Sequence, residues 1–394
     1  YIYKAYKKIF ILLKLGEDIM KKMGFGLMRL PQTDKDKPET INQEQVNKMT
    51  ELFLEKGYTY FDTAYPYHNG KSEIALKEAL KNHHRESYIV ADKLPIFAIT
   101  KEEEVESIFK EQLKRCGVEY FDYYLLHNIS PFSEAGYIDV DSYKFLKQQK
   151  DAGKIKKLGF SSHGDAKYIE KYLQKYPDMD FIQLQINYLD WESQTIESKK
   201  CYEVAKKHDL EVIVMEPLKG GFLANIPEDA NDLIKKFNPT LTPVELALRF
   251  VANLDNVFMV LCGVSSYKQM EENIEIFENM QPLSKEELDL IKQVSELINS
   301  KITVPCTKCN YCINECPVNI NIPYVFDLYN SEKLLNEDGF TTYQVTYINY
   351  MKNKKNGPAS ACIDCGKCVE KCPQQINIPQ VMKDVVESLE NKPM

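Results

Sequence analysis

The sequence has 394 residues and a formal net charge of −8, with 44% hydrophobic and 27% charged side chains. This ordinary globular composition excludes a disordered or collagen-like chain. The acidic balance argues against a nucleic acid or an anionic membrane surface as partner. No apolar run approaches the roughly 20 residues that a membrane helix needs, and no secretory signal is recognised. We therefore expect a cytoplasmic protein.

The chain divides into three parts. Residues 1–19 share no pattern with the rest of the chain, and we expect a disordered extension or sequence upstream of a native start at Met20 or Met23. In residues 20–300, apolar β-rich runs alternate with helix-patterned segments. Strands are expected at 25–30, 58–63, 88–93, 121–127, 156–161, 181–188, 211–216 and 257–263. Helices are expected at 43–56, 73–82, 101–116, 141–151, 166–175, 196–208, 243–253, 267–279 and 285–298.

Eight strand–helix units over about 280 residues predict an α/β fold, namely a (β/α)8 TIM barrel. The alternative is a doubly wound sheet. Dinucleotide-binding sheets of that kind carry Gly-x-Gly-x-x-Gly after the first strand, and this sequence has none there. The barrel is the better interpretation.

Eight of the eleven cysteines fall in two runs near the carboxyl end, each reading Cys-x2-Cys-x2-Cys-x3-Cys-Pro. This spacing is typical of [4Fe–4S] ligation, in which three cysteines of a run hold one cluster and the fourth ligates the other. A zinc site does not need the third closely spaced cysteine, and disulfides are unusual in the cytosol. The expected sets are Cys306, Cys309, Cys312 and Cys372 for one cluster, and Cys362, Cys365, Cys368 and Cys316 for the other.

The two runs belong to an internal repeat with an offset of 56 residues, and both continue into Ile-Asn-Ile-Pro, at 320–323 and 376–379. Helical spacing is also present at 324–335 and 341–353. Residues 301–394 therefore resemble a helical variant of the bacterial ferredoxin module with two [4Fe–4S] clusters.

Polar side chains stand at the carboxyl ends of successive strands of the expected barrel. This is the end of a TIM barrel at which the active site lies. Asp62, Tyr67, Lys93 and His127 are the titratable ones. An ammonium beside a tyrosine favours phenolate, and a carboxylate behind the lysine holds that ammonium. Tyr67 would then deliver a proton to a carbonyl oxygen, while His127 hydrogen-bonds the same oxygen. The group transferred to carbon would be a hydride, which implies a nicotinamide cofactor.

Over residues 20–300 the sequence resembles the aldo-keto reductase family. The matching segments are 61–67, 92–93, 125–127, 159–162 and 272–274. The resemblance implies that Asp62, Tyr67, Lys93 and His127 form the family's catalytic tetrad. It further implies that the cofactor contacts are Ser161, Ser162 and Gln183 at the carboxamide, Met215, Pro217 and Leu218 after strand seven, and Glu272 and Asn273 at the adenine.

The sequence departs from the family pattern where the nucleotide phosphate would lie. Gly263 and Gln269 replace the lysine and arginine that surround the 2′-phosphate in NADPH-preferring members, which leaves Lys268 as the only expected cation. A glutamine cannot supply the charge of a bidentate arginine. Met215 also stands where the family often stacks an aromatic ring. We therefore expect NADH, or NADPH with weak discrimination.

Three functions remain open. The first is hydride transfer between the nicotinamide and a small carbonyl or alcohol substrate, with the clusters exchanging electrons with a redox partner protein. The second is the same reductase with purely structural clusters. The third is an electron-transfer or binding protein with a non-catalytic barrel. A flavin between the nicotinamide and the clusters stays open, because barrels can bind flavin phosphate without a motif.

Overall fold

The computed structural model describes residues 21–34, 37–130, 141–193, 196–300, 303–306, 310–335, 341–353, 355–372, 374 and 376–391. The expected extension at 1–19 and the proposed ligand Cys309 lie outside these residues. No helix in the described ranges is long and apolar enough to cross a membrane.

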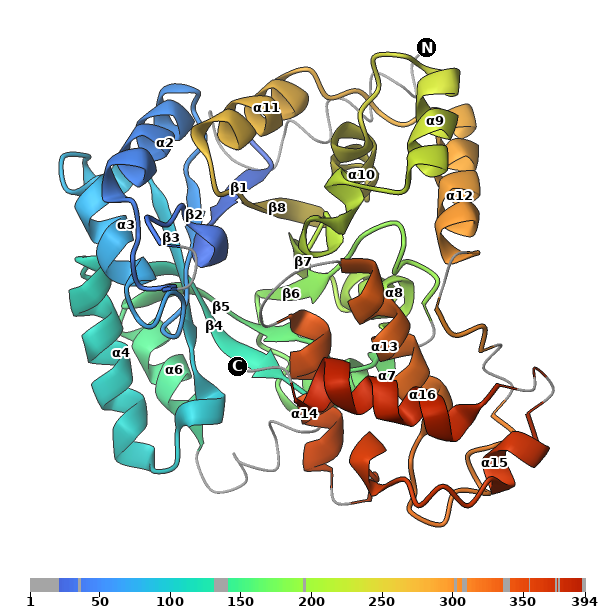
Figure 1. Cartoon of the computed structure of the whole chain (residues 1–394). Coiled ribbons are helices and arrows are strands. Elements are labelled where there is room, and N and C mark those ends of the chain that lie inside the picture. Colours follow the sequence, from blue (N-terminus) through green and yellow to red (C-terminus); the bar gives the residue numbers. More distant parts are fainter. Residues whose placement is uncertain are drawn as a thin grey trace.

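Eight strands close into a barrel in chain order, and every neighbouring pair is parallel (Figure 1). This confirms the predicted TIM barrel. The strands are β1 (Met23–Gly26), β2 (Tyr60–Asp62), β3 (Ile89–Leu94), β4 (Phe121–Ile129), β5 (Ile155–Ser162), β6 (Phe181–Gln185), β7 (Glu211–Met215) and β8 (Val257–Gly263).

Helices surround the barrel, and several begin at polar capping residues. Thr242 caps α10 with Pro243 in its first turn, and Ser284 forms a capping box with Glu287 at the start of α12. The helices are α2 (Gln43–Glu55), α3 (Ser72–Leu80), α4 (Glu102–Cys116), α6 (Ser142–Asp151), α7 (Ala166–Lys175), α8 (Ser198–Lys207), α9 (Glu228–Phe237), α10 (Pro243–Ala252), α11 (Tyr267–Glu278) and α12 (Lys285–Asn299).

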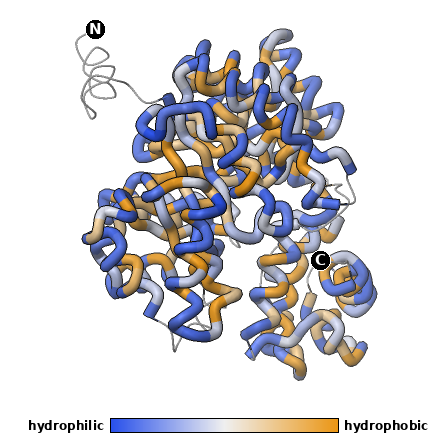
Figure 2. Tube along the Cα trace, turned by 90° about the vertical axis from the view of Figure 1, so that its left-hand side faces the viewer, coloured by the Kyte–Doolittle hydropathy of each residue, from blue (hydrophilic) through white to orange (hydrophobic). Residues whose placement is uncertain are grey.

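The apolar core has two parts. Side chains that point into the barrel fill its interior, and those that point outward pack under the helices, as expected for parallel strands buried on both faces. Along the chain trace, hydrophobic segments gather inside and hydrophilic segments lie on the outer faces of the helices (Figure 2). The interior set is Tyr60, Ala91, Tyr123, Leu125, Phe181, Ile213, Met259 and Leu261.

Two predicted strand ends were wrong, and one helix was not predicted. The first strand ends at Gly26, because residues Leu27–Arg29 turn into a short 3-10 helix. The sixth strand ends at Gln185 instead of residue 188, since Asn187 accepts the backbone N–H of Asp190 and closes a turn there. Helix α9 was not predicted and follows the β7 loop.

The carboxy-terminal region is helical; it packs on the loop after β7 and lies beside α8, where Thr346 and Cys201 line one pocket (Figure 1). Its two Ile-Asn-Ile-Pro copies form equivalent structures. Asn321 accepts the N–H of Tyr324 at the start of one helix, and Asn377 accepts that of Gln380 at the start of another. The helices are α13 (Ile322–Leu335), α14 (Thr342–Lys352), α15 (Lys367–Glu370) and α16 (Ile378–Val385).

Candidate active site

The alternation of β-strand side chains places three of the four expected catalytic residues on the inner face of the barrel. Side chains two residues apart share a face of a strand. Asp62 and Lys93 therefore follow the interior residues Tyr60 and Ala91 toward the carboxyl ends of β2 and β3. His127 follows Leu125 on β4 in the same way. These residues lie above the apolar core, at the end where TIM-barrel sites form.

Lys93 and Asp62 form a buried ion pair. Lys93 Nζ lies 2.6 Å from Asp62 Oδ1 and 2.5 Å from the carbonyl oxygen of Thr63, and Lys93 is 0% exposed. Burial acts to lower the pKa of Lys93, but the Asp62 carboxylate and the Tyr67 phenol outweigh burial and raise it. Burial raises the pKa of Asp62, against the opposite effect of Lys93. The lysine is therefore held as a cation beneath Tyr67.

Tyr67 lies in the turn after β2, between Lys93 and His127. Lys93 Nζ is 4.9 Å from the centroid of the Tyr67 ring, and the rings of Tyr67 and His127 meet edge-on with centroids 6.1 Å apart. Lys93 acts to lower the pKa of Tyr67, as the sequence suggested, but burial is the larger effect and the pKa is raised overall. The phenol thus keeps its proton at neutral pH.

His127 is held neutral. Burial lowers its pKa well below the ordinary value, and the charges of Lys93 and His163 act in the same direction. Within the described part of the chain, its buried Nδ1 atom has no hydrogen-bond partner. Phe97, about half exposed, lies edge-on to the imidazole with a centroid distance of 5.5 Å. An uncharged imidazole can hydrogen-bond a substrate oxygen without competing as an acid.

Polar side chains on the outer side of the barrel wall hydrogen-bond to the backbone of Lys93. Its N–H donates to Asp92 Oδ1 at 2.8 Å, and its carbonyl oxygen accepts a bond from Gln112 Nε2 at 3.0 Å. Gln112 accepts the hydroxyl of Tyr124 in turn. The sequence interpretation missed these side chains, although a charged residue beside Lys93 in a buried strand was a usable signal.

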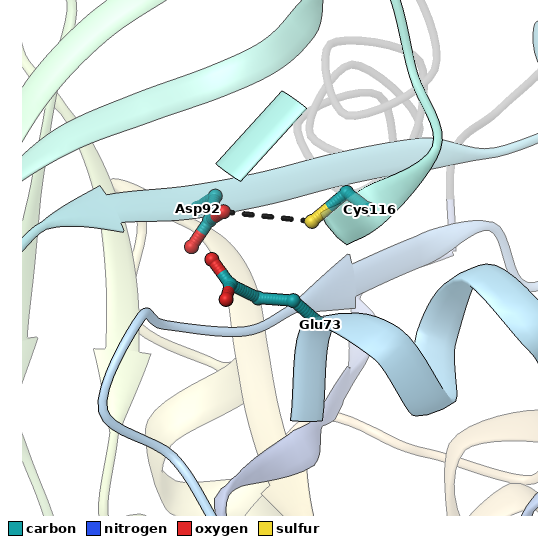
Figure 3. Close-up of side chains that lie close together, drawn as sticks. All are labelled: Glu73, Asp92 and Cys116. Carbon is teal, nitrogen blue, oxygen red and sulfur yellow. Dashed lines mark hydrogen bonds between the residues drawn. The ribbon is translucent and has the colours of Figure 1, made fainter. Parts of the chain in front are cut away.

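Asp92 belongs to a buried cluster with Glu73 at the start of α3 and Cys116 at the end of α4 (Figure 3). The two carboxyl groups point toward one another, and the Cys116 thiol donates to Asp92 Oδ2 at 3.5 Å. Burial raises the pKa of Asp92 well above its ordinary value, and Glu73 adds to this; the pKa of Glu73 is also raised by burial. Arg115, 3.1 Å from Glu73, supplies one positive charge. The pair therefore retains a proton between its carboxyl groups.

The expected carboxamide contacts meet at the ends of β5 and β6. Ser161 pairs with Gln183 in the strand register. The Ser161 hydroxyl oxygen accepts the N–H of Asn128 at 2.8 Å, whereas the Ser162 hydroxyl donates to the Ile129 carbonyl at 2.7 Å and accepts the N–H of Gly164. Gln183 Oε1 is buried and unpaired among the described residues. Ser161 and Gln183 thus have hydrogen-bonding capacity left for an amide.

Met215 ends β7 and lies beside Gln183, with the amide Nε2 of Gln183 3.6 Å from the Met215 sulfur. The chain then turns through Glu216, Pro217 and Leu218, and Leu218 is half-buried. The expected cofactor contacts on β6 and β7 are therefore neighbours.

The expected adenine and phosphate contacts lie at β8 and α11. Gly263 ends β8, the Gln269 amide oxygen accepts the N–H of Ser265 at 2.8 Å, and Asn273 is buried. Exposed Glu272 lies 3.6 Å from Lys268. Lys268 stays the predicted cation, and the structure adds a second one nearby: a Cβ on Gly263 would lie 3.6 Å from the side-chain carbon Cδ of Arg29. Only the shape of the loop after β1 brings this arginine close.

The seven described cysteines of the two runs gather in two groups, each drawn from both runs. Cys306, Cys312 and Cys372 line one pocket. Cys368 in turn lies near enough to Cys362, Cys316 and Cys365 for all three to affect its thiol electrostatically. The fourth cysteine of each run thus joins the other run, and none of the ten described cysteines is in a disulfide.

The comparisons with known proteins agree with this geometry. Residues 22–296 match the model of the aldo/keto reductase family, and residues 298–373 match that of the 4Fe-4S dicluster domain. A curated relative, the NADH-specific methylglyoxal reductase of Escherichia coli K12, is 26% identical over 55% of this chain and 78% of its own length. Probable aldo-keto reductase 1 of Glycine max is also 26% identical, over 65% of this chain and 80% of its own.

Among solved structures, the holo form of aldo-keto reductase AKR11C1 from Bacillus halodurans superimposes with a TM-score of 0.58. It is 26% identical and covers 71% of this chain and 95% of its own. An aldo-keto reductase from Klebsiella pneumoniae in complex with NADPH has a TM-score of 0.56, covering 71% and 91%, and at 21% identity it supports the fold alone. With the family matched across the whole barrel, the chain belongs to the aldo/keto reductase family of NAD(P)-dependent oxidoreductases and carries a carboxy-terminal 4Fe-4S dicluster domain.

Proposed function

We propose that this protein transfers hydride between a nicotinamide cofactor and a small carbonyl or alcohol substrate at the mouth of the barrel, while two [4Fe–4S] clusters exchange electrons with a partner protein. The observation that carries the first half is the buried Lys93–Asp62 pair beneath Tyr67, with neutral His127 edge-on to the phenol.

Each member of the tetrad has a distinct task in this reaction. Tyr67 holds its proton until a substrate oxygen develops negative charge, and then donates it. Lys93 stabilises the phenolate that remains, and Asp62 keeps the ammonium in place. His127 donates a hydrogen bond to the same oxygen and orients it. The nicotinamide, when bound, supplies or accepts the hydride.

The polar groups left unpaired at β5 and β6 support a carboxamide site at Ser161 and Gln183. Ser162 is a weaker candidate, because its hydroxyl hydrogen already serves Ile129. Met215, Pro217 and Leu218 would border the nucleotide, and Glu272 and Asn273 would contact the adenine.

NADH is the slightly favoured cofactor. Uncharged Gly263 and Gln269 stand at the places implied for the 2′-phosphate contacts, and the relative from Escherichia coli is named as NADH-specific. Arg29 argues the other way, since a guanidinium binds phosphate well; its methylene carbons pass Gly263 and its guanidinium lies near Gly220, in the next loop. A preference for NADPH above tenfold in Michaelis constants would overturn this choice.

The grouping of the cysteines supports two cross-ligated clusters. One would be held by Cys306, Cys309, Cys312 and Cys372, the other by Cys316, Cys362, Cys365 and Cys368. Thiolates are the ligands that such clusters need, and the closely spaced runs supply three to each.

A second candidate function is the same reductase with clusters that serve only structure. It is favoured by the direct contact of α14 with the barrel, where Tyr343 lies 3.3 Å from Asp190. In that case the clusters would fold the domain that covers this part of the barrel.

One anaerobic experiment separates the two candidates. The reconstituted protein, with iron and sulfide counted, is mixed with NADH and separately with NADPH while the visible cluster absorption is followed. Bleaching by either nucleotide would support electron exchange and rank the cofactors. Carbonyl reduction without bleaching would favour structural clusters. If neither bleaching nor carbonyl reduction were seen, in wild type and in Tyr67→Phe alike, the proposed reductase would be rejected.

A further inference from the structure

The loop after β7 has an unusual backbone. Glu216 and Lys219 adopt positive φ angles of 55° and 47°, and Gly220 and Gly221 come next with 67° and 103°. Residues other than glycine rarely occupy this region and remain there only where their surroundings hold them. The loop begins at the proposed cofactor contacts after β7, so the groups that hold it also shape that side of the site.

A buried ion pair holds the loop from inside the barrel domain. Lys219 is 1% exposed, and its Nζ lies 2.6 Å from Asp190 Oδ1. Asp190 Oδ2 accepts further bonds from Asn187 Nδ2 at 2.9 Å and Gln185 Nε2 at 3.1 Å. Asn187 also donates to the carbonyl oxygen of Glu216 at 3.3 Å. The network therefore joins the β7 loop to the end of β6, the strand that carries Gln183.

The dicluster domain completes this network from outside. Tyr343 on α14 is 0% exposed; its hydroxyl accepts a bond from Lys219 Nζ and donates to Asp190 Oδ2 at 3.3 Å. The neighbouring Thr342 donates to Glu216 Oε1. On α13, Leu335 lies close to Gly220: a Cβ added to Gly220 would be 3.3 Å from the Leu335 side chain. Without these helices the ion pair would meet water, which weakens it.

We propose that Tyr343 and Thr342 are positioning residues, through which the dicluster domain holds the β7 loop in the shape that receives the nicotinamide nucleotide. Cofactor affinity then depends on the docking of α14, independently of whether the clusters pass electrons. This inference rests on the proposed function, because it needs a nucleotide at the barrel mouth.

Helix α14 offers a matched control one turn further along. The Tyr347 hydroxyl donates to Glu390 at 2.6 Å and accepts the N–H of Ala359 at 2.7 Å, both within the dicluster domain. Tyr347→Phe removes a hydroxyl of the same kind from the same helix without touching the β7 loop. A general weakening of the domain would affect both variants, whereas positioning would affect only Tyr343→Phe.

The test compares reconstituted full-length wild type, Tyr343→Phe, Thr342→Val and Tyr347→Phe. Hydrogen exchange is followed in the β7 loop, where the N–H groups of Lys219 and Leu223 bond to Glu216 and Leu218. Nucleotide dissociation constants, Michaelis constants, kcat and iron content are measured in parallel. Thr342→Val keeps the proposal testable if Tyr343→Phe fails to fold.

We expect Tyr343→Phe and Thr342→Val to exchange faster in this loop and to bind nucleotide about tenfold more weakly, since each loses a hydrogen bond to a charged group. Their kcat and iron content should match those of Tyr347→Phe and wild type. Unchanged loop exchange, or equal weakening of nucleotide binding in Tyr347→Phe, would overturn the inference. Failure of wild type to bind either nucleotide would instead reject the proposed function, and the inference with it.

Discussion

Asp62 Oδ1 accepts a 2.6 Å hydrogen bond from Lys93 Nζ at a place where Lys93 is entirely shielded from water. A buried ion pair is compatible with a stable fold only while both charges are present, because removal of one leaves the other buried and unpaired. The residues proposed to be catalytic are therefore also a point of vulnerability for the fold.

Asp62→Asn tests this vulnerability. The variant should lose about 3–5 kcal/mol of stability, because the Lys93 ammonium stays buried without a counter-charge. Its activity should fall as well, since the ammonium is no longer held beneath Tyr67. Thermal denaturation and steady-state kinetics measure the two effects.

Asp122→Asn is the control for this experiment. Asp122 Oδ2 lies 2.6 Å from an Arg85 guanidinium nitrogen, in an ion pair that does not involve the tetrad. It should destabilise the protein and leave kcat close to that of wild type. Equal loss of kcat in both variants would contradict a specific role for Asp62.

Tyr67→Phe tests the proton donor. Loss of the hydroxyl should lower kcat by about 10²–10⁴, the usual contribution of general acid catalysis, with nucleotide affinity unchanged. Tyr65→Phe is the control in the same turn, because the Tyr65 hydroxyl bonds to Glu111 at 3.0 Å instead of the tetrad. Stopped-flow measurement of carbonyl reduction compares them. If Tyr67→Phe kept wild-type turnover, the barrel would not use this residue as its acid.

The Glu73–Asp92 pair predicts a pH dependence of stability. Burial raises the pKa of Asp92 in the folded protein, so the folded state keeps a proton that the unfolded state releases above about pH 4. The stability from this group is complete below that pH and is lost as the pH rises toward the folded pKa. The loss is at most about 1.4 kcal/mol per pH unit for one proton.

Asp92→Asn should remove this dependence. Urea denaturation at several pH values between 5 and 8 should show the stability of wild type falling relative to that of the variant as the pH rises. Cys116→Ala serves as a control, because it removes a neighbour of Asp92 without removing a carboxyl group. A stability difference between wild type and Asp92→Asn that is constant with pH would show that no proton is shared.

Paired cysteine substitutions test the cross-ligation. If ligands cross between the runs, the double variant Cys312→Ser/Cys372→Ser damages one cluster and should retain about four of about eight iron atoms per chain. Cys368→Ser/Cys372→Ser would damage both. Iron counting with electron paramagnetic resonance of the reduced protein distinguishes the two variants. The opposite ranking would mean that each run holds its own cluster.

The sequence predicted the barrel because its strands are apolar runs with polar residues at their carboxyl ends, a pattern that is local and periodic. The same alternation located Asp62, Lys93 and His127, which extend the interior faces of their strands. Local patterns do not state which loops meet, however. Nothing in the sequence around Arg29 indicates that its side chain packs against Gly263.

The contact between the two domains could not be predicted from the sequence either. Lys219 and Tyr343 are far apart in the sequence, and each is unremarkable in its own segment. The helical spacing at 341–353 predicted a helix around Tyr343, but not that the Tyr343 hydroxyl would reach an ion pair of the barrel. Contacts of this kind depend on how whole elements dock, and no short-range periodicity encodes that.

Helix α14 contacts the β7 loop through Tyr343 and Thr342, and it contacts the segment before Cys362 through Tyr347, which bonds to Ala359. This arrangement has a consequence for a chain exposed to oxygen. If oxidation dissolves the clusters and loosens α14, the nucleotide loop loses Tyr343 and Thr342 at the same moment. A damaged molecule would then bind reduced nicotinamide more weakly and consume less of it when the nucleotide is scarce. Through this contact, the proposed affinity of the barrel for nucleotide would depend on the state of the dicluster domain.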